Sequence, residues 1–151
     1  MSRFLTALSV TPLADGQQWR LNEDLQYRST LLLDATPHDG DVIRVPKGFI
    51  TDFASVPAML RGVLPPWNVW GCAAVLHDHL YWTQYLDRDI ADSVLLEAMR
   101  VLGVDDAIAA LIHTGVRVGG QASWDNNAEL KASGYTRLAP LADQPPYASP
   151  I

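Results

Sequence analysis

The sequence predicts an α+β fold, with a small N-terminal antiparallel β-sheet followed by about three packed α-helices. In roughly the first fifty residues, short apolar runs alternate with turn signals such as Asp15-Gly16 and Asp39-Gly40, which is typical of antiparallel strands. From about Pro57 the apolar residues recur at helical spacing instead. The length of 151 residues suits one domain, and 48% apolar residues exclude a chain that is disordered throughout.

The expected strands are short, and each ends at a Pro, Gly or Asn-Asp type of turn. Strands close together in sequence and separated by tight turns usually pair with their neighbours, so we expect an antiparallel meander. The predicted strands are Phe4 to Val10, Gln17 to Leu21, Leu25 to Leu33, Val42 to Val45 and Phe49 to Thr51.

The first two helices have clear boundary signals. Pro65-Pro66 precedes a helix predicted over Trp67 to Trp82. Asp87 is placed to cap a second helix, over Arg88 to Leu102, which Gly103 closes. Apolar residues of this second segment recur at spacings of three and four, which predicts one buried face.

The third helix is expected to begin at Asp105 or Asp106 and to break at Gly119-Gly120. The last dozen residues contain four prolines, which favour neither helix nor strand. We therefore expect a single α+β domain over residues 1–125 and an extended Pro-rich C-terminal tail over residues 126–151.

Composition excludes several classes of function. The chain has 11 basic and 17 acidic residues, a formal charge of −6, whereas a protein that binds the phosphate backbone broadly has the opposite bias. We expect no nucleic-acid partner. The single cysteine forbids an internal disulfide, no apolar run approaches the roughly 18 residues of a membrane span, and the N-terminus lacks the apolar core of a signal peptide. These features predict folding in a cytoplasm.

The most informative residues for function lie around position 77. His77 and Tyr81 are four residues apart and share one side of the first helix, and Asp78 is next to His77. Asp92 lies on the apolar stripe of the second helix, where a carboxylate is costly unless it is paired. Two helices with a short connection are usually antiparallel neighbours. The simplest partner for Asp92 is then His77, with Tyr81 donating a second hydrogen bond, while His79 points away and is expected at the surface.

This arrangement has two interpretations. In the first, His77, Asp92 and Tyr81 form a buried polar tie that fixes how two helices meet. In the second, they are catalytic: Asp92 orients His77, and the other ring nitrogen of His77 activates a water molecule as a general base. Asp78 would then bind a metal ion or position the substrate.

The segment from Thr51 to Pro57 is the second candidate region, because it connects the β half to the helical half. Thr51, Asp52 and Ser55 could line a cleft that faces the His77 helix, with Asp52 as a possible metal ligand. Asp and Ser also stabilise turns and cap helices, which is the structural alternative. Arg117 could pair with a carboxylate of the same cleft or be a solvated surface arginine.

Several of these segments resemble one known pattern. The resemblance rests on Val45 to Pro57, Ala73 to Tyr81, Ala91-Asp92 and Gly115 to Arg117, and it extends over roughly residues 18 to 124. The chain resembles the uncharacterised phage and prophage family known as domain of unknown function 1353. This resemblance implies a bacteriophage origin and gives no activity.

A more distant resemblance concerns the helical motifs alone. His77-Asp78 with Tyr81, followed by Asp92, is similar to the site of calcium-dependent phospholipases A. That resemblance implies that His77 activates water, that Asp78 holds calcium, and that Asp92 and Tyr81 orient the histidine. Oxygen ligands alone favour calcium or magnesium, whereas a histidine ligand favours zinc or another transition metal.

We therefore expect a bacteriophage protein that is a metal-assisted hydrolase of a host-envelope bond, with calcium or zinc as the metal. The alternative is a non-catalytic virion structural protein of the tail or baseplate. A Pro-rich terminus stays mobile unless something holds it, so this alternative expects the tail to dock on other virion proteins or on a second copy of the chain. The expected location is the virion, in the phage tail, or the host cytoplasm.

Overall fold

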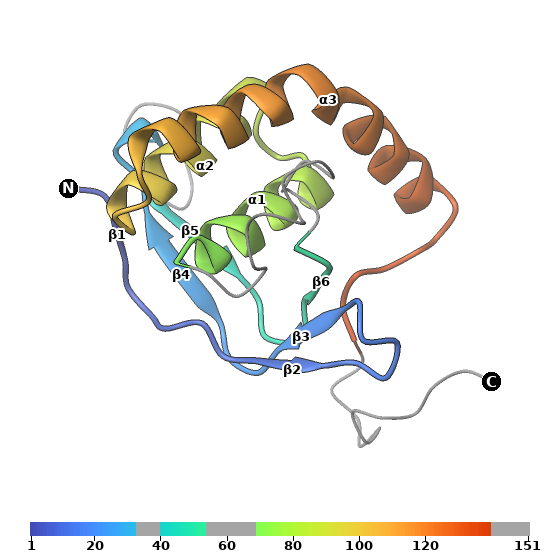
Figure 1. The fold of residues 1–151 in the computed structure, drawn as a ribbon. Coiled ribbons are helices and arrows are strands. Elements are labelled where there is room, and N and C mark those ends of the chain that lie inside the picture. Colours follow the sequence, from blue (N-terminus) through green and yellow to red (C-terminus); the bar gives the residue numbers. More distant parts are fainter. Residues whose placement is uncertain (33–39, 54–68, 140–151) are drawn as a thin grey trace.

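The computed structural model describes residues 1–32, 40–53 and 69–139, and the predicted α+β class is confirmed (Figure 1). Short strands come first and three helices follow. In the described part of the chain, no helix is long and apolar enough to cross a membrane. The strands are β1 (Arg3–Phe4), β2 (Val10–Pro12), β3 (Trp19–Leu21), β4 (Leu25–Arg28), β5 (Val42–Val45) and β6 (Ile50–Thr51).

The predicted meander is wrong, because the strands divide between two antiparallel sheets. One three-stranded sheet has the order β1-β4-β5 and the other β2-β3-β6. The pairs β2–β3 and β4–β5 join strands that are neighbours in sequence, but β1 pairs with β4 and β6 pairs with β3, past intervening strands. The run expected over Leu25 to Leu33 also ends early, since a 3-10 turn follows at Thr30–Leu32.

The helices are α1 (Gly71–Thr83), α2 (Arg88–Val101) and α3 (Asp106–Ala132). The predicted start signals of α2 and α3 are confirmed: Asp87 and Asp105 are the N-cap residues, and the Asp105 carboxylate accepts the backbone N–H groups of Ala107 and Ile108. The predicted start of the first helix is wrong where it can be compared: residues 67 and 68 lie outside the described residues, but residues 69 and 70 form a turn and the helix begins at Gly71, after the N-cap residue Trp70.

The predicted break of the third helix at Gly119-Gly120 is wrong. α3 continues to Ala132, so residues 126–132 of the expected tail are helical. A glycine inside a helix costs about 1 kcal/mol relative to alanine. Tertiary packing offsets that cost, because Val116, Gly120 and Asn127 of α3 are buried against the rest of the molecule. Residues 140–151 of the expected tail lie outside the described residues.

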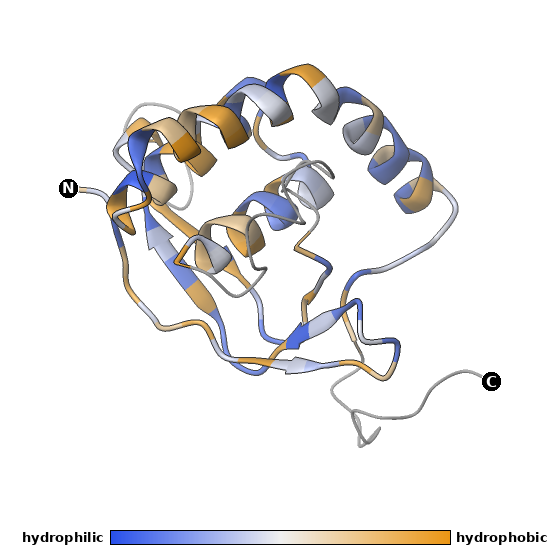
Figure 2. Cartoon of the chain, viewed as in Figure 1, coloured by the Kyte–Doolittle hydropathy of each residue, from blue (hydrophilic) through white to orange (hydrophobic). Residues whose placement is uncertain are grey.

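α1 is the centre of the molecule, with the sheets on one side and α2 and α3 on the other (Figure 1). Every residue from Ala73 to Trp82 is buried, and a helix enclosed on all sides is usually apolar all round. This helix departs from that rule, because His77, Asp78 and His79 make its middle hydrophilic (Figure 2). Buried polar groups need partners, and those partners define the candidate site.

The chain after α3 returns to the second sheet. The backbone N–H of Ile50 donates to the carbonyl of Arg137 at 2.7 Å, and the N–H of Ala139 donates to the carbonyl of Gly48 at 2.9 Å. Phe49 and Leu138 form the bridge between these two bonds. Residues 137–139 therefore lie antiparallel to residues 48–50, and they extend the second sheet beyond β6.

Candidate functional site

The carboxylate of Asp92 joins α1 to α2. Its Oδ1 lies 2.8 Å from Nε2 of His77 and accepts a hydrogen bond from the Tyr81 hydroxyl at 2.7 Å. The predicted contacts of Asp92 with His77 and Tyr81 are thereby confirmed. His77 is 2% exposed and Asp92 is 0% exposed, so solvent does not compete for these bonds.

Local sequence explains this geometry. His77 and Tyr81 lie one helical turn apart, and their rings approach to 4.1 Å between centroids. Asp92 lies among the buried apolar residues of α2, which pack against α1. The same packing that buries the apolar stripe therefore brings the carboxylate to the two α1 side chains.

Two arginines bind the second oxygen of the same carboxylate. Nη1 of Arg88 lies 3.3 Å from Asp92 Oδ2, and Nη1 of Arg117 lies 3.2 Å from it. Arg117 also pairs with Asp89, and Arg88 also donates to the carbonyls of Val116 and Arg117. Arg117 thus pairs with a carboxylate, one of the two alternatives for it. Sequence reasoning gave no role to Arg88, although its i,i+4 spacing to Asp92 could have revealed it.

These contacts fix the protonation states of the network. Burial by itself would raise the pKa of Asp92, but hydrogen bonds from His77 and Tyr81 outweigh it and hold that pKa below its usual value. Burial raises the pKa of Tyr81, and its hydrogen bond to Asp92 raises it further. At neutral pH the tyrosine is therefore a donor and the aspartate an ionised acceptor.

Gly120 has no side chain and so leaves the space that the Tyr81 hydroxyl occupies. A Cβ atom on Gly120 would overlap with Tyr81 Oη and would lie 3.2 Å from Arg88 Nη1. On neighbouring Gly119 the same atom would meet nothing within 4 Å. The residue that was expected to break α3 instead lets α3 approach the site closely.

Asp78 lies outside this network. Its Oδ2 accepts the hydroxyl of Thr51 at 2.5 Å, and Thr51 Oγ1 also accepts the backbone N–H of Phe53 at 3.2 Å. Thr51 is fully buried, and Phe53 has φ of +53°, an uncommon backbone angle for a bulky residue. The structure thus brings the end of β6 to α1, as predicted for Thr51.

Of the two other residues predicted for this cleft, Asp52 and Ser55, the structure describes only one. Asp52 is half-buried and directly follows Thr51 at the end of β6, and Ser55 lies outside the described residues. Among residues 1–32, 40–53 and 69–139, no group of three or more His, Cys, Asp or Glu side chains is arranged to hold a metal ion.

The surface position predicted for His79 is wrong. Only 7% of His79 is exposed, its ring packs edge-on against Phe49, and its Nδ1 has no hydrogen-bond partner among the described residues. Burial lowers its pKa from 6.5 to about 4. The prediction failed because it assumed a helix with one exposed face, whereas both faces of α1 are covered by other elements.

Comparison with known proteins gives a family and no activity. No curated protein and no solved structure matched the chain. A family described as a protein of unknown function (DUF1353) matches residues 19–116, a stretch that includes His77, Tyr81 and Asp92 and stops just before Arg117. Since this match covers more than half of the sequence, the chain belongs to the DUF1353 family.

Proposed function

We propose that this protein is a hydrolase in which His77 is the general base and Asp92 and Tyr81 orient it. The observation that carries the proposal is the pair of hydrogen bonds on Asp92 Oδ1, from His77 at 2.8 Å and from Tyr81 at 2.7 Å. A base held by a carboxylate that is itself held by a third group is a recurrent arrangement for activating water.

The geometry selects the ring nitrogen. An ionised Asp92 favours the tautomer of His77 with its proton on Nε2, so Nδ1 carries the lone pair. In the reaction, Nδ1 takes a proton from water while the water oxygen bonds to an ester carbonyl carbon. The Asp92 carboxylate stabilises the resulting imidazolium. That imidazolium then gives the proton to the departing alkoxide.

The metal ion and the substrate belong to the same proposal. Asp78 is next to His77 in the chain, and it reaches Thr51 through space, so a divalent cation at Asp78 would lie near the base. Asp52 is the further carboxylate of this region. The proposed substrate class is an ester or cell-wall bond of a bacterial envelope, which follows from the phage and phospholipase resemblances of the sequence.

A second candidate function is structural. His77 and Asp92 are 2% and 0% exposed, and both oxygens of Asp92 are engaged. Burial of this degree also suits a polar tie that fixes the helices of a virion component. This alternative assigns the network to stability alone.

Substitution of the base separates the two functions. Glutamine at position 77 can keep a hydrogen bond to Asp92 but cannot take a proton from water. We expect His77→Gln to stay folded by circular dichroism and to lose hydrolysis of phospholipid vesicles or peptidoglycan fragments that the wild-type protein hydrolyses. His113→Gln, on the half-buried part of α3, is the matched control. Equal activity of His77→Gln and wild type would exclude the general base.

Metal binding is tested by titration with calcium and with zinc. The wild-type protein, Asp78→Asn and the surface control Asp125→Asn are compared by calorimetry. We expect stoichiometric binding that disappears only in Asp78→Asn, because that substitution removes a charged oxygen ligand. Absence of binding at millimolar ion in the wild type would remove the metal from the proposal and leave the His77 base to be judged by its own variant.

A further inference from the structure

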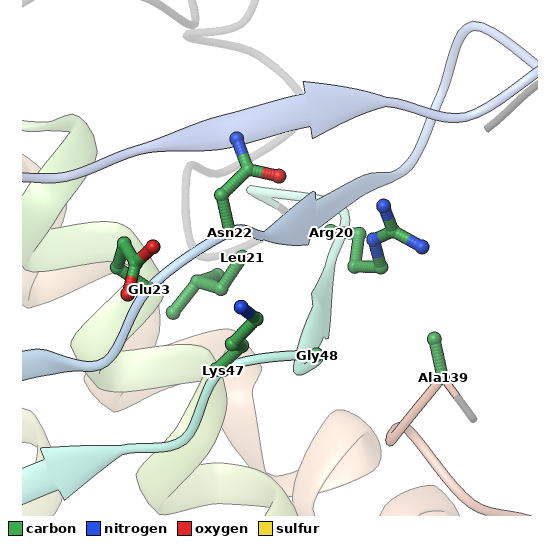
Figure 3. A pocket seen from close by; sticks show the side chains of 7 residues that line it. All are labelled: Arg20, Leu21, Asn22, Glu23, Lys47, Gly48 and Ala139. Carbon is green, nitrogen blue, oxygen red and sulfur yellow. The ribbon is translucent and has the colours of Figure 1, made fainter. Parts of the chain in front are cut away.

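A concave site lies on the second sheet, and none of its lining residues belongs to the His77 network. It is a cavity of about 300 Å³. We call it the β3 cavity, because β3 and the residues directly after it form one side (Figure 3). The turn before β6 and the returning segment after α3 form the rest. The lining residues are Arg20, Leu21, Asn22, Glu23, Lys47, Gly48 and Ala139.

The hollow exists because small residues meet in the middle of the sheet. Gly48 has no side chain, and its φ of +87° is one that residues with a Cβ rarely adopt. The Ala139 N–H donates to the Gly48 carbonyl, so a methyl group lies beside the glycine. The longer side chains of Arg20, on β3, and of Lys47, in the turn, lie around these two small residues (Figure 3).

The two cations of the β3 cavity have no carboxylate partner within the described residues. Two other arginines of the β half are paired, since Arg28 binds Asp41 at 2.9 Å and Arg44 binds Asp24, whereas the exposed Arg3 forms no ion pair among the described residues. The Asp24 carboxylate also accepts the backbone N–H of Lys47 at 2.7 Å. That bond fixes the turn, and the Lys47 ammonium forms no ion pair in the described residues but lies near enough to Asp24 for its charge to help lower the Asp24 pKa.

Figure 3 shows how the charged groups are distributed. Arg20 lies on the Ala139 side of the cavity, Lys47 lies near Leu21, and Glu23 is at the end opposite Arg20. In this view the Lys47 ammonium lies between Glu23 and Arg20, and the two cations outnumber the one carboxylate of the lining. Two unpaired cations beside a hollow are notable in a chain with a formal charge of −6.

We propose that the β3 cavity binds a small molecule through an anionic group, a carboxylate or a phosphate, held between Arg20 and Lys47. Its volume is at the lower end of the range for small-molecule sites, which suits a metabolite-sized ligand. Arginine offers a planar pair of donors for such an anion, and lysine adds a point charge. This site shares no residue with the His77 network, so the two proposals stand or fall separately.

The proposal is tested by nuclear magnetic resonance on the full-length, ¹⁵N-labelled chain. Inorganic phosphate and acetate are titrated at constant ionic strength, with sodium chloride as the reference salt. We expect at least one of the two anions to give saturable shifts of the Lys47, Gly48 and Ala139 amides. Arg20→Gln and Lys47→Gln should each weaken that binding about tenfold, the equivalent of one charge-assisted hydrogen bond.

Arg3→Gln is the matched control, because it removes the same charge from the exposed start of β1 in the other sheet. It should leave the affinity unchanged. An equal loss in Arg3→Gln would show a general charge effect and overturn the site. Shifts that grow without saturation for both anions would overturn it too. Saturation by acetate alone or by phosphate alone supports the site and identifies its anion.

Discussion

Three carboxylates of helix α2 have partners, Asp89, Asp92 and Glu97, and the last two each accept several hydrogen bonds in different parts of the molecule. Asp92 accepts from His77 and Tyr81 and pairs with two arginines. Glu97, five residues later, accepts only from hydroxyl groups and one backbone N–H, which come from the N-terminal half of the chain. Its donors are the side chains of Ser2, Tyr27, Ser29 and Thr30 and the N–H of Thr30.

The difference lies in what the donors can do. Hydroxyl groups of Ser, Thr and Tyr do not exchange a proton with a carboxylate near neutral pH. The Glu97 cluster can therefore only fasten the N-terminal residues and the first sheet to α2. The Asp92 cluster instead contains an imidazole, the group to which the proposed function assigns proton transfer. A buried carboxylate whose hydrogen bonds are all satisfied can therefore belong either to a structural cluster or to a catalytic one.

The largest expected contrast is between Asp92→Asn and Glu97→Gln. Loss of the Asp92 charge leaves two arginines without their buried partner, so we expect the free energy of unfolding to fall by about 3–5 kcal/mol. Glu97→Gln should cost about 1–3 kcal/mol, because its donors are neutral and the cluster is partly exposed. Urea denaturation measures both. Equal losses would mean that the arginines add nothing to the Asp92 cluster.

A pH titration separates both carboxylates from His79. Both carboxylates have lowered pKa values, so their stabilisation is complete above the ordinary carboxyl pKa and is lost as pH falls from there through their lowered folded-state values. His79 has a folded-state pKa of about 4 against 6.5 when unfolded, so the unfolded chain takes up the proton first. Stability should therefore fall by roughly 3 kcal/mol as pH decreases from 6.5 to 4.

The His79 effect is measured by urea denaturation of wild type and of His79→Gln at pH 7 and pH 4. The variant should lose much less stability between the two pH values. His113→Gln serves as the reference, since burial lowers the pKa of His113 as well, on a half-buried side chain. A variant that keeps the full pH dependence of the wild type would assign that dependence to the carboxylates instead.

A smaller effect is expected where α3 approaches the Asp92 cluster. Gly120→Ala should cost about 1–3 kcal/mol, because its Cβ overlaps with the Tyr81 hydroxyl and forces a shift. Gly119→Ala has open space around it and should be neutral or stabilise by up to about 1 kcal/mol. Thermal or urea unfolding of both variants gives the comparison. A harmless Gly120→Ala would show that the Tyr81 hydroxyl can move without loss.

The smallest expected losses of stability come from removing the hydroxyl groups of two buried tyrosines. Tyr27→Phe removes a donor from Glu97 and Tyr81→Phe removes one from Asp92, and each should cost about 1 kcal/mol of stability. Their consequences for hydrolysis should differ. Only Tyr81→Phe should shift the pH profile of kcat, because Tyr81 acts through Asp92 on His77. A shift of the same size in Tyr27→Phe would contradict the separation of the two clusters.

Much of the helical half could be predicted from local signals. Asp105 begins α3 with its side chain as a cap, and Asp87 is at the N-cap of α2 without a side-chain hydrogen bond, where its charge still suits a helix N-terminus; both effects depend on neighbouring residues only. The contact of His77 with Asp92 was also predictable. A carboxylate on an apolar stripe needs a partner, and a short connection between helices limits the choice.

Residues far apart in sequence were harder to predict. Arg117 reaches Asp92 from α3, and Thr51 reaches Asp78 from β6. Sequence reasoning left the carboxylate partner of Arg117 open and named no partner for Thr51. Nothing local indicated that Gly120 would meet Tyr81 or that His79 would be enclosed. Such contacts depend on which faces of α1 are covered, and that is decided by packing across the whole domain.

The sequence by itself determined the fold class, the boundaries of α2, the start of α3 and the pairing of His77 with Asp92. Each of these follows from patterns within one or two adjacent elements. Tertiary structure alone decided the division of the strands into two sheets, the continuation of α3 through Gly120 and the burial of His79. The physical reason is that periodicity reports what a segment prefers, whereas the choice of sheet partner and the enclosure of α1 depend on surface buried between distant segments.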